Sequence, residues 1–304
     1  MMLNFKSRLR AIYARMPRWV RKSIREARSS GARRRALEAL RRPPSPAEPH
    51  GLPGELVVSL TSYPPRFASL HLTLQSLLRQ SVKPDRIVVW IAHADLASVP
   101  ESVNALRGEG LEIRGCEDLR SFKKLVPALQ AFPEAHIVTA DDDLYFPPDW
   151  LQVLLARRGD WITARRAHRV VADDSGKLRP YVHWPPATEA STAGRPRGDL
   201  LPTTGAGVLF PPGSLHPDAT NRELFEALCP DGDDLWFYWC AQRAGTLVRL
   251  AGPPLRLVTW EGSQDQSLWD ANRLGGNDRM IARLEAAYGR ALLEPDGQGG
   301  TVSG

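Results

Sequence analysis

The most informative stretch of the chain covers residues 137–150 and reads IVTADDDLYFPPDW. A short apolar run typical of a buried strand leads into three consecutive carboxylates, and a Pro-Pro turn and the start of a helix follow. Like charges crowded at a strand end repel one another, so a cation beside them would be stabilising. Oxygen ligands suit a hard ion such as Mg²⁺ or Mn²⁺, which commonly bridges carboxylates to nucleotide phosphates. The alternative is a solvated acidic turn with Asp141, Asp142 and Asp143 simply exposed.

Strand and helix patterns alternate on both sides of this stretch. Upstream, apolar runs predict strands at 56–60, 87–91 and 111–113, and helices at 70–80 and 122–131. Downstream, we expect strands at 161–164 and 246–250, a glycine-flexed loop at 205–210 that runs into another strand, and helices at 222–228, 233–244 and 278–288. This alternation predicts an α/β fold with a mostly parallel, Rossmann-type sheet flanked by helices. In such a sheet, ligands bind at the carboxyl ends of the strands, where the acidic triplet lies.

The net charge of +6 is unevenly distributed along the chain. Residues 1–50 hold 14 Lys and Arg against three Glu, a net of +11, and the rest of the chain carries −5. Within residues 1–42, apolar side chains recur at helical spacing and predict an amphipathic basic helix: Leu9, Ile12, Tyr13, Met16, Val20 and Ile24. Such a helix favours an anionic membrane surface. A disordered solubilising tail is the alternative, and nucleic-acid binding is disfavoured because the acidic body offers no second basic surface.

The domain organisation follows from changes in composition. A Pro-rich linker over residues 43–54 separates the basic segment (1–42) from a folded domain at 55–290, and residues 291–304 form a polar, flexible tail. The three cysteines form no CxxC pair, which argues against a disulfide framework. No run approaches the roughly 18–20 apolar residues of a membrane span, and the N-terminus has no apolar core like a secretory signal. We therefore expect a cytoplasmic protein, attached peripherally to the inner face of the membrane through residues 1–42.

Further motifs follow in a fixed order along the chain. The first predicted strand leads into Ser59-Leu60-Thr61-Ser62-Tyr63-Pro64-Pro65-Arg66, and the next helix ends near Leu77-Leu78-Arg79-Gln80-Ser81. Lys123-Lys124-Leu125 precede the acidic triplet, and Gly205-Ala206-Gly207 and Asp231-Gly232-Asp233-Asp234-Leu235-Trp236 follow it. Over residues 55–290, these motifs resemble those of nucleotide-sugar glycosyltransferases of the GT-A fold, in the broad group similar to family two. The likeness is strongest to bacterial enzymes that assemble surface polysaccharide or lipopolysaccharide.

The resemblance implies a metal-dependent, inverting transferase that moves a sugar from a nucleotide-sugar donor to a hydroxyl of a glycan or lipid-linked acceptor. Asp141 and Asp143 would be the first and third members of the family's DXD motif. Asp143 would coordinate the divalent metal, Mn²⁺ or Mg²⁺, and Asp141 would contact the ribose or the metal shell. The remaining expected donor-binding residues are Thr61, Tyr63, Arg66, Lys124, Asp142, Gly205 and Gly207. The alternatives are a turn-capping role for Asp142, a solvated helix lysine for Lys124 and a surface ion pair for Arg66.

The acidic run at 231–234 opens a predicted helix. One Asp at a helix N-cap would explain a single carboxylate but not its neighbours. In inverting enzymes of this fold, an acidic residue in this segment deprotonates the acceptor hydroxyl, so Asp234 or Asp233 is the expected general base. Arg166, His168 and Trp184 are candidates for the acceptor site, since aromatic faces stack on sugars and Arg binds phosphate. For His168, a buried and hydrogen-bonded ring is the alternative.

Two other functions compete with this interpretation. One is a non-catalytic membrane-surface assembly protein that keeps a degenerate transferase domain, which the intact Asp141, Asp143 and Asp234 argue against. The other is a nucleotidyltransferase, which typically has a Gly- and Arg-rich loop after the first strand. Residues 61–66 lack such a loop.

Overall fold

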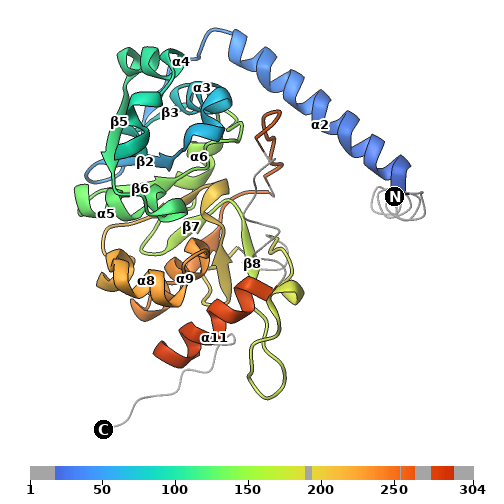
Figure 1. Cartoon of the computed structure of the whole chain (residues 1–304), viewed down its shortest axis with the longest axis vertical. Coiled ribbons are helices and arrows are strands. Elements are labelled where there is room, and N and C mark those ends of the chain that lie inside the picture. The colour runs from blue at the N-terminus through green and yellow to red at the C-terminus, as the bar shows by residue number, and fades with distance from the viewer. Residues whose placement is uncertain (1–17, 189–193, 254, 264–274, 291–304) are drawn as a thin grey trace.

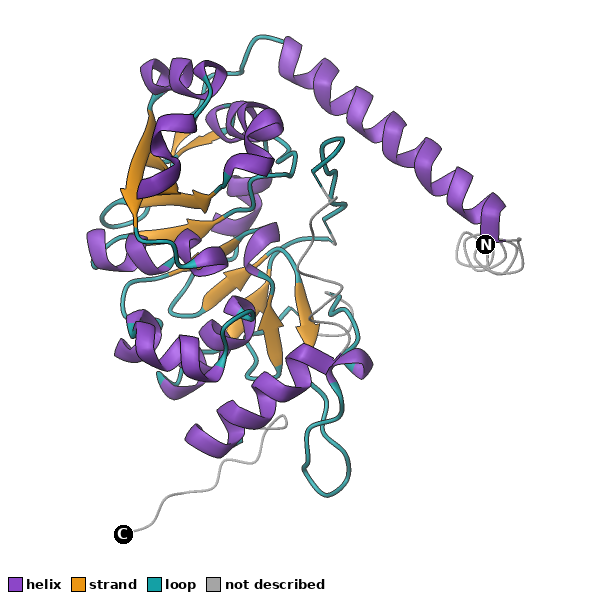
Figure 2. Ribbon diagram, viewed as in Figure 1, coloured by secondary structure: helices purple, strands orange, loops and turns teal. Residues whose placement is uncertain are grey.

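The computed structural model describes residues 18–188, 194–253, 255–263 and 275–290. Its centre is a seven-stranded sheet in the order β11-β7-β10-β6-β2-β4-β5, with helices around it (Figures 1 and 2). The strands are β2 (Leu56–Thr61), β4 (Arg86–Ala92), β5 (Leu111–Cys116), β6 (His136–Thr139), β7 (Ile162–Ala164), β10 (Val208–Phe210) and β11 (Val248–Leu250). The predicted α/β class, with a mostly parallel sheet flanked by helices, is confirmed.

Strand β10 is the reversed strand of this sheet. It pairs antiparallel with β6 on one side and with β7 on the other, whereas the other neighbouring strands pair in parallel. Its first residue, Val208, lies opposite both Thr139 and Ala164, which end β6 and β7. Consequently, the residues before β10 lie at the same edge of the sheet as the residues after β6 and β7. This edge carries the acidic triplet.

Two apolar layers cover the two faces of the sheet. Alternate residues of each strand point to opposite faces, so Val57 and Val88 belong to one buried cluster while Val58 and Val89 belong to the other. The first layer contains α5 (Val126–Ala131), α8 (Arg222–Leu228), α9 (Asp233–Arg243) and α11 (Asn277–Tyr288). The second contains α3 (Phe67–Leu78), α4 (Glu101–Asn104) and α6 (Trp150–Leu155).

Several local elements differ from the sequence-based expectation. The helix predicted over 122–131 is instead a 3₁₀ turn, η4 (Arg120–Lys124), followed by α5, whose first turn contains Pro127. Proline lacks the N–H that would continue a helix and fits a helix start, so the chain restarts there. Two small sheets were not predicted: β1 (Glu48–Pro49) pairs with β3 (Val82–Lys83), and β8 (Ala167–Arg169) pairs with β9 (Leu200–Pro202).

A long helix, α2 (Arg18–Arg41), precedes the sheet, and its N-terminal end projects away from the α/β body (Figure 1). Near its other end, Ala36 and Leu40 are buried against Trp260, with Tyr145 and Leu72 beside them. The apolar stripe predicted from Leu9 to Ile24 lies outside the residues whose side chains are described. Within the described ranges, no helix is both long and apolar enough to span a bilayer.

Candidate active site

The acidic triplet follows β6 and lies against the turn that leads into β10. This turn is η6 (Thr204–Ala206), and the Gly205 carbonyl accepts a hydrogen bond from the Asp141 N–H at 3.1 Å. A Cβ at Gly205 would overlap the Asp141 carboxylate, so only glycine leaves room for it. The reversed direction of β10 thus explains why residues distant in sequence meet here.

Each carboxylate of the triplet has a different partner. Lys124 Nζ donates to Asp141 Oδ1 at 2.8 Å, and Arg66 forms an ion pair with Asp143. Asp142 is also buried, and its carboxylate accepts a hydrogen bond from Ser62 Oγ at 2.6 Å. The solvated acidic turn considered above is therefore wrong for Asp142 and Asp143, although Asp141 remains partly exposed.

Burial sets the ionisation of the two inner carboxyl groups. Burial raises the pKa of Asp142 to about 7, against the opposing effects of Ser62 and Arg66. Burial and repulsion from Asp141 raise the pKa of Asp143, and they outweigh the lowering effect of Arg66. Because the site disfavours the ionised form of these carboxyl groups, additional positive charge beside them would be stabilising.

The second acidic pair begins α9 but does not cap it. The N-cap residue is Gly232, and no side chain caps the helix, so helix capping does not account for Asp233 and Asp234. Instead, Asp234 Oδ1 accepts hydrogen bonds from the Thr204 N–H at 2.8 Å and from Thr204 Oγ1 at 2.7 Å. Burial, with repulsion from Asp233, raises the pKa of Asp234 to about 6.

Lys124 connects the two acidic groups. Besides Asp141, its Nζ lies 3.3 Å from Asp233 Oδ2 and 3.2 Å from Thr204 Oγ1. Burial by itself lowers the pKa of Lys124, but Asp141, Asp233 and Asp234 outweigh it and raise this pKa well above its ordinary value. Lys124 is therefore a buried lysine whose acidic partners favour its charged form, and the solvated helix lysine considered above is wrong.

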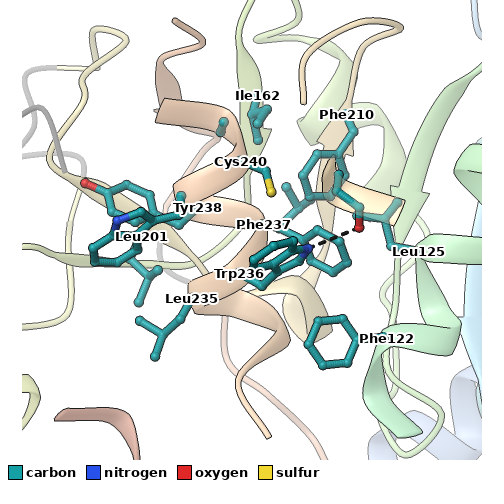
Figure 3. Close-up of a cluster of buried hydrophobic side chains, with 14 of the residues drawn as sticks. Phe122, Leu125, Ile162, Leu201, Phe210, Leu235, Trp236, Phe237, Tyr238 and Cys240 are labelled. Atoms are coloured by element: carbon teal, nitrogen blue, oxygen red, sulfur yellow. Dashed lines mark hydrogen bonds between the residues drawn. The ribbon is translucent and has the colours of Figure 1, made fainter. Parts of the chain in front are cut away.

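An aromatic cluster fixes the separation between Lys124 and α9. Phe122, two residues before Lys124, stacks on Phe225 with ring centroids 4.2 Å apart and meets the edge of Phe237 at 5.8 Å. Figure 3 shows Phe122 beside Trp236 and Phe237 of α9. Aromatic pairs of this kind add to the stability gained from area burial, so this cluster helps to pack η4 against α9.

A later segment, residues 256–260, supports the backbone of the triplet. The Trp260 N–H donates to the Asp143 carbonyl at 3.1 Å, and Trp260 Nε1 donates to Thr73 Oγ1 at 2.8 Å. Thr73 Oγ1 donates in turn to the Asp142 carbonyl at 2.9 Å. Sequence reasoning found neither Trp260 nor Thr204, because no local pattern marks either residue.

The remaining predicted donor-site residues lie near this edge but have mainly structural contacts. Thr61 Oγ1 donates to the Trp90 carbonyl at 2.8 Å, and the Tyr63 carbonyl accepts from the Arg66 N–H at 2.9 Å. Gly207 has a φ of 114°, and a Cβ there would collide with the Trp150 indole. The close approach of Trp150 is thus sufficient to explain this glycine.

The predicted acceptor residues lie around a further aromatic, Tyr181. Its ring lies 5.8 Å from His168 and 5.2 Å from Trp184, measured between centroids. Burial and the charge of Asp234 raise the pKa of Tyr181 to about 12, whereas burial and the charge of Arg166 lower the pKa of His168. Trp184 is buried, and its carbonyl lies 3.3 Å from His168 Nδ1. The negative charge of Asp234 thus affects the ionisation of Tyr181, so the aromatic cluster around Tyr181 is electrostatically coupled to the start of α9.

The donor atoms at the triplet fit a divalent ion that is only partly held by protein. Among the described residues, no three His, Cys, Asp or Glu side chains form a group able to hold a metal. Mg²⁺ is usually bound through one or two carboxylates together with substrate phosphates and water. Asp141 and Asp143 would supply two such carboxylates, and Gly205 leaves the space that the first one needs.

Comparisons with known proteins give distant structural similarities. No family model and no curated protein matches the sequence. A mannosyltransferase from Pyrobaculum calidifontis, solved with GDP-Man and Mn²⁺, is 15% identical, with 90% of this chain and 75% of that chain covered and a TM-score of 0.48. A 4-diphosphocytidyl-2C-methyl-D-erythritol synthase from Anaerococcus prevotii is 13% identical, with coverages of 69% and 94% and a TM-score of 0.39. An inositol-1-phosphate CTP transferase from T. maritima is 10% identical, with coverages of 76% and 96% and a TM-score of 0.39.

Similarities at these TM-scores do not establish what the chain does. Its function has to be inferred from its own residues.

Proposed function

We propose that this protein is a metal-dependent glycosyltransferase that uses a nucleotide-sugar donor and a hydroxyl acceptor, with a role in the synthesis of cell-surface polysaccharide. One observation carries the proposal. Two acidic groups far apart in sequence share a single network through Lys124 and Thr204, which joins Asp141 of the triplet to Asp233 and Asp234. A transferase needs a cationic site for the leaving diphosphate and, beside it, a base for the attacking hydroxyl.

On the donor side, Asp141 and Asp143 would hold the divalent ion. A bound ion stabilises the charge that develops on a diphosphate leaving group without proton transfer. Lys124 keeps Asp141 in place and adds fixed positive charge where that negative charge develops.

On the acceptor side, Asp234 is the proposed general base. Both hydrogen bonds from Thr204 converge on Asp234 Oδ1 and fix the orientation of the carboxylate. A pKa of about 6 suits a base that is ionised at neutral pH and still accepts a proton. Asp233 lies beside Lys124 and is the weaker candidate, because that cation stabilises its charge.

Arg166, His168 and Tyr181 are the proposed acceptor wall, and the buried Trp184 packs behind Tyr181. The basic segment 1–42 would bring this wall to lipid-linked acceptors on the anionic cytoplasmic face of a membrane, since each Lys or Arg near such a surface contributes about 1 kcal/mol.

The test is calorimetric titration of a panel of nucleotide sugars with and without Mn²⁺, followed by an assay of nucleoside diphosphate release with candidate acceptors. We expect Asp143→Asn to lose metal-dependent donor binding. Asp234→Asn should bind the donor normally and turn over at least ~100-fold more slowly. Asp231→Asn is the matched control, because Asp231 lies in the same segment but pairs with Arg120 at the surface.

Other outcomes would point to the competing functions. Pyrophosphate released from a nucleoside triphosphate in the presence of a sugar phosphate, with no nucleoside diphosphate released from any nucleotide sugar, would identify a nucleotidyltransferase. Absence of binding and turnover with every donor would support the non-catalytic assembly protein.

A further inference from the structure

The carboxylate proposed as the main metal ligand already has a cation beside it. Arg66 ends the 3₁₀ turn η1 (Pro64–Arg66) after β2, and its guanidinium forms an ion pair with Asp143. Only 13% of the Arg66 side chain and 7% of the Asp143 side chain are exposed. This contact is therefore a desolvated ion pair, unlike the surface ion pair considered from the sequence.

A guanidinium and a divalent ion compete for such a carboxylate. Both bind to the carboxylate oxygens of Asp143, and two cations close together in a poorly hydrated site repel each other strongly. Arg66 also has an alternative partner within reach, because its Nη1 lies 3.7 Å from Asp142 Oδ1. A small movement of the side chain would therefore exchange Asp143 for Asp142 without leaving the guanidinium unpaired.

We propose that Arg66 is a resident counter-ion at the metal position, which holds Asp143 in the metal-free protein and moves off it when a divalent ion binds. This inference rests on the proposed function, because it assumes that Asp143 is a metal ligand. Once displaced, the guanidinium lies near Asp142 at the donor edge of the sheet, and its planar fork suits a phosphate oxygen pair. Metal alone should then bind weakly, since it must first displace Arg66.

The test measures Mn²⁺ binding to the protein by electron paramagnetic resonance at pH 8, with no nucleotide present. Arg66→Met removes the competitor, so we expect its Kd for Mn²⁺ to fall at least about tenfold below that of the wild type. Arg66→Lys keeps a single point charge without the fork, so its Kd should lie between the two. An equal or higher Kd in Arg66→Met would overturn the inference, since Arg66 would then support the metal site or leave it unaffected.

Arg197→Met is the matched control. Arg197 is 15% exposed and pairs with Asp199, so it resembles Arg66 in burial and in having a carboxylate partner. It precedes β9, and its hydrogen bonds with Asp199 and Val248 do not involve the triplet. Its replacement should leave the Mn²⁺ affinity unchanged, and a tenfold gain there would show that the effect of Arg66→Met is not specific.

Asp143→Asn separates this inference from the proposed function. If Asp143→Asn and the wild type bind Mn²⁺ equally well, the metal site itself is wrong. If Asp143→Asn loses the ion but Arg66→Met gains nothing, only the counter-ion role is wrong.

Folding is controlled by a second measurement. Should Arg66→Met be unfolded without metal, Mn²⁺ must restore its thermal transition, because the ion replaces the missing charge. Failure of Mn²⁺ to do so, together with wild-type affinity in Arg66→Lys, would also overturn the proposal.

Discussion

Replacing Lys124 with methionine tests the charge balance of the site, because Met removes the cation and keeps a long side chain. Lys124 Nζ faces Asp141 at 2.8 Å and Asp233 at 3.3 Å. The Asp141 side chain is 40% exposed and can be hydrated, whereas the Asp233 side chain is 13% exposed. Breaking a buried ion pair by removing one partner costs about 3–5 kcal/mol. Since Asp233 bears most of that cost, we expect the free energy of unfolding to fall by about 3 kcal/mol.

Lys123 provides the matched control, because it is the adjacent residue and is similarly buried. The Lys123 and Lys124 side chains are 5% and 9% exposed. Lys123 pairs at 2.7 Å with Asp118, whose side chain is 65% exposed. A hydrated carboxylate loses little when its partner is removed, so Lys123→Met should cost no more than about 1 kcal/mol.

Urea unfolding followed by circular dichroism measures both variants. Adding Asp233→Asn to Lys124→Met removes the unpaired charge and should restore at least about 1 kcal/mol. The reasoning is refuted if Lys123→Met and Lys124→Met lose the same stability, or if Asp233→Asn restores none of the loss.

Three further predictions concern activity and membrane binding. Turnover should rise with pH through about 6 and then level off, because the raised pKa of Asp234 keeps the proposed base protonated below that value. The residual turnover of Asp234→Asn should not show this rise with pH. Gly205→Ala should weaken Mn²⁺ binding, because the added Cβ displaces the Asp141 carboxylate. The urea midpoint should change little, since the displaced carboxylate can rotate into solvent. Deleting residues 1–27, which hold eight Lys and Arg and one Glu, should abolish co-sedimentation with anionic vesicles but not donor hydrolysis; equal sedimentation of both forms would contradict the anchor.

The strands of the sheet and the acidic triplet were predictable because their signals are local. A short apolar run bounded by turn residues is typical of a buried strand, and three adjacent Asp residues are visible in the sequence itself. The helix over 222–228 and the strand ending before Asp141 accordingly agree with the structure.

The contacts that assemble the site were not predictable in the same way. Arg66 meets Asp143 across 77 residues, and Trp260 meets Thr73 across 187. Such contacts depend on which strands are neighbours in the sheet. The antiparallel direction of β10 cannot be read from its sequence, because a strand of three residues is too short to show a periodic pattern. The burial of Asp142 likewise follows from Ser62 and Thr73 packing over it, which no local pattern encodes.

Strand β10 also governs the order in which the molecule can form. Strands β2, β4, β5 and β6 all lie within residues 56–139 and pair with one another. β10 must return from residue 208 to reach β6, and it is the strand through which β7 and β11 join the sheet. Because the chain is synthesised from its N-terminus, residues 56–139 are available to pair before β10 has been made. During synthesis, the growing chain can therefore form a four-stranded sheet whose triplet already has Arg66 and Lys124 as partners, and its acidic site is completed only when Thr204, Asp233 and Asp234 are added.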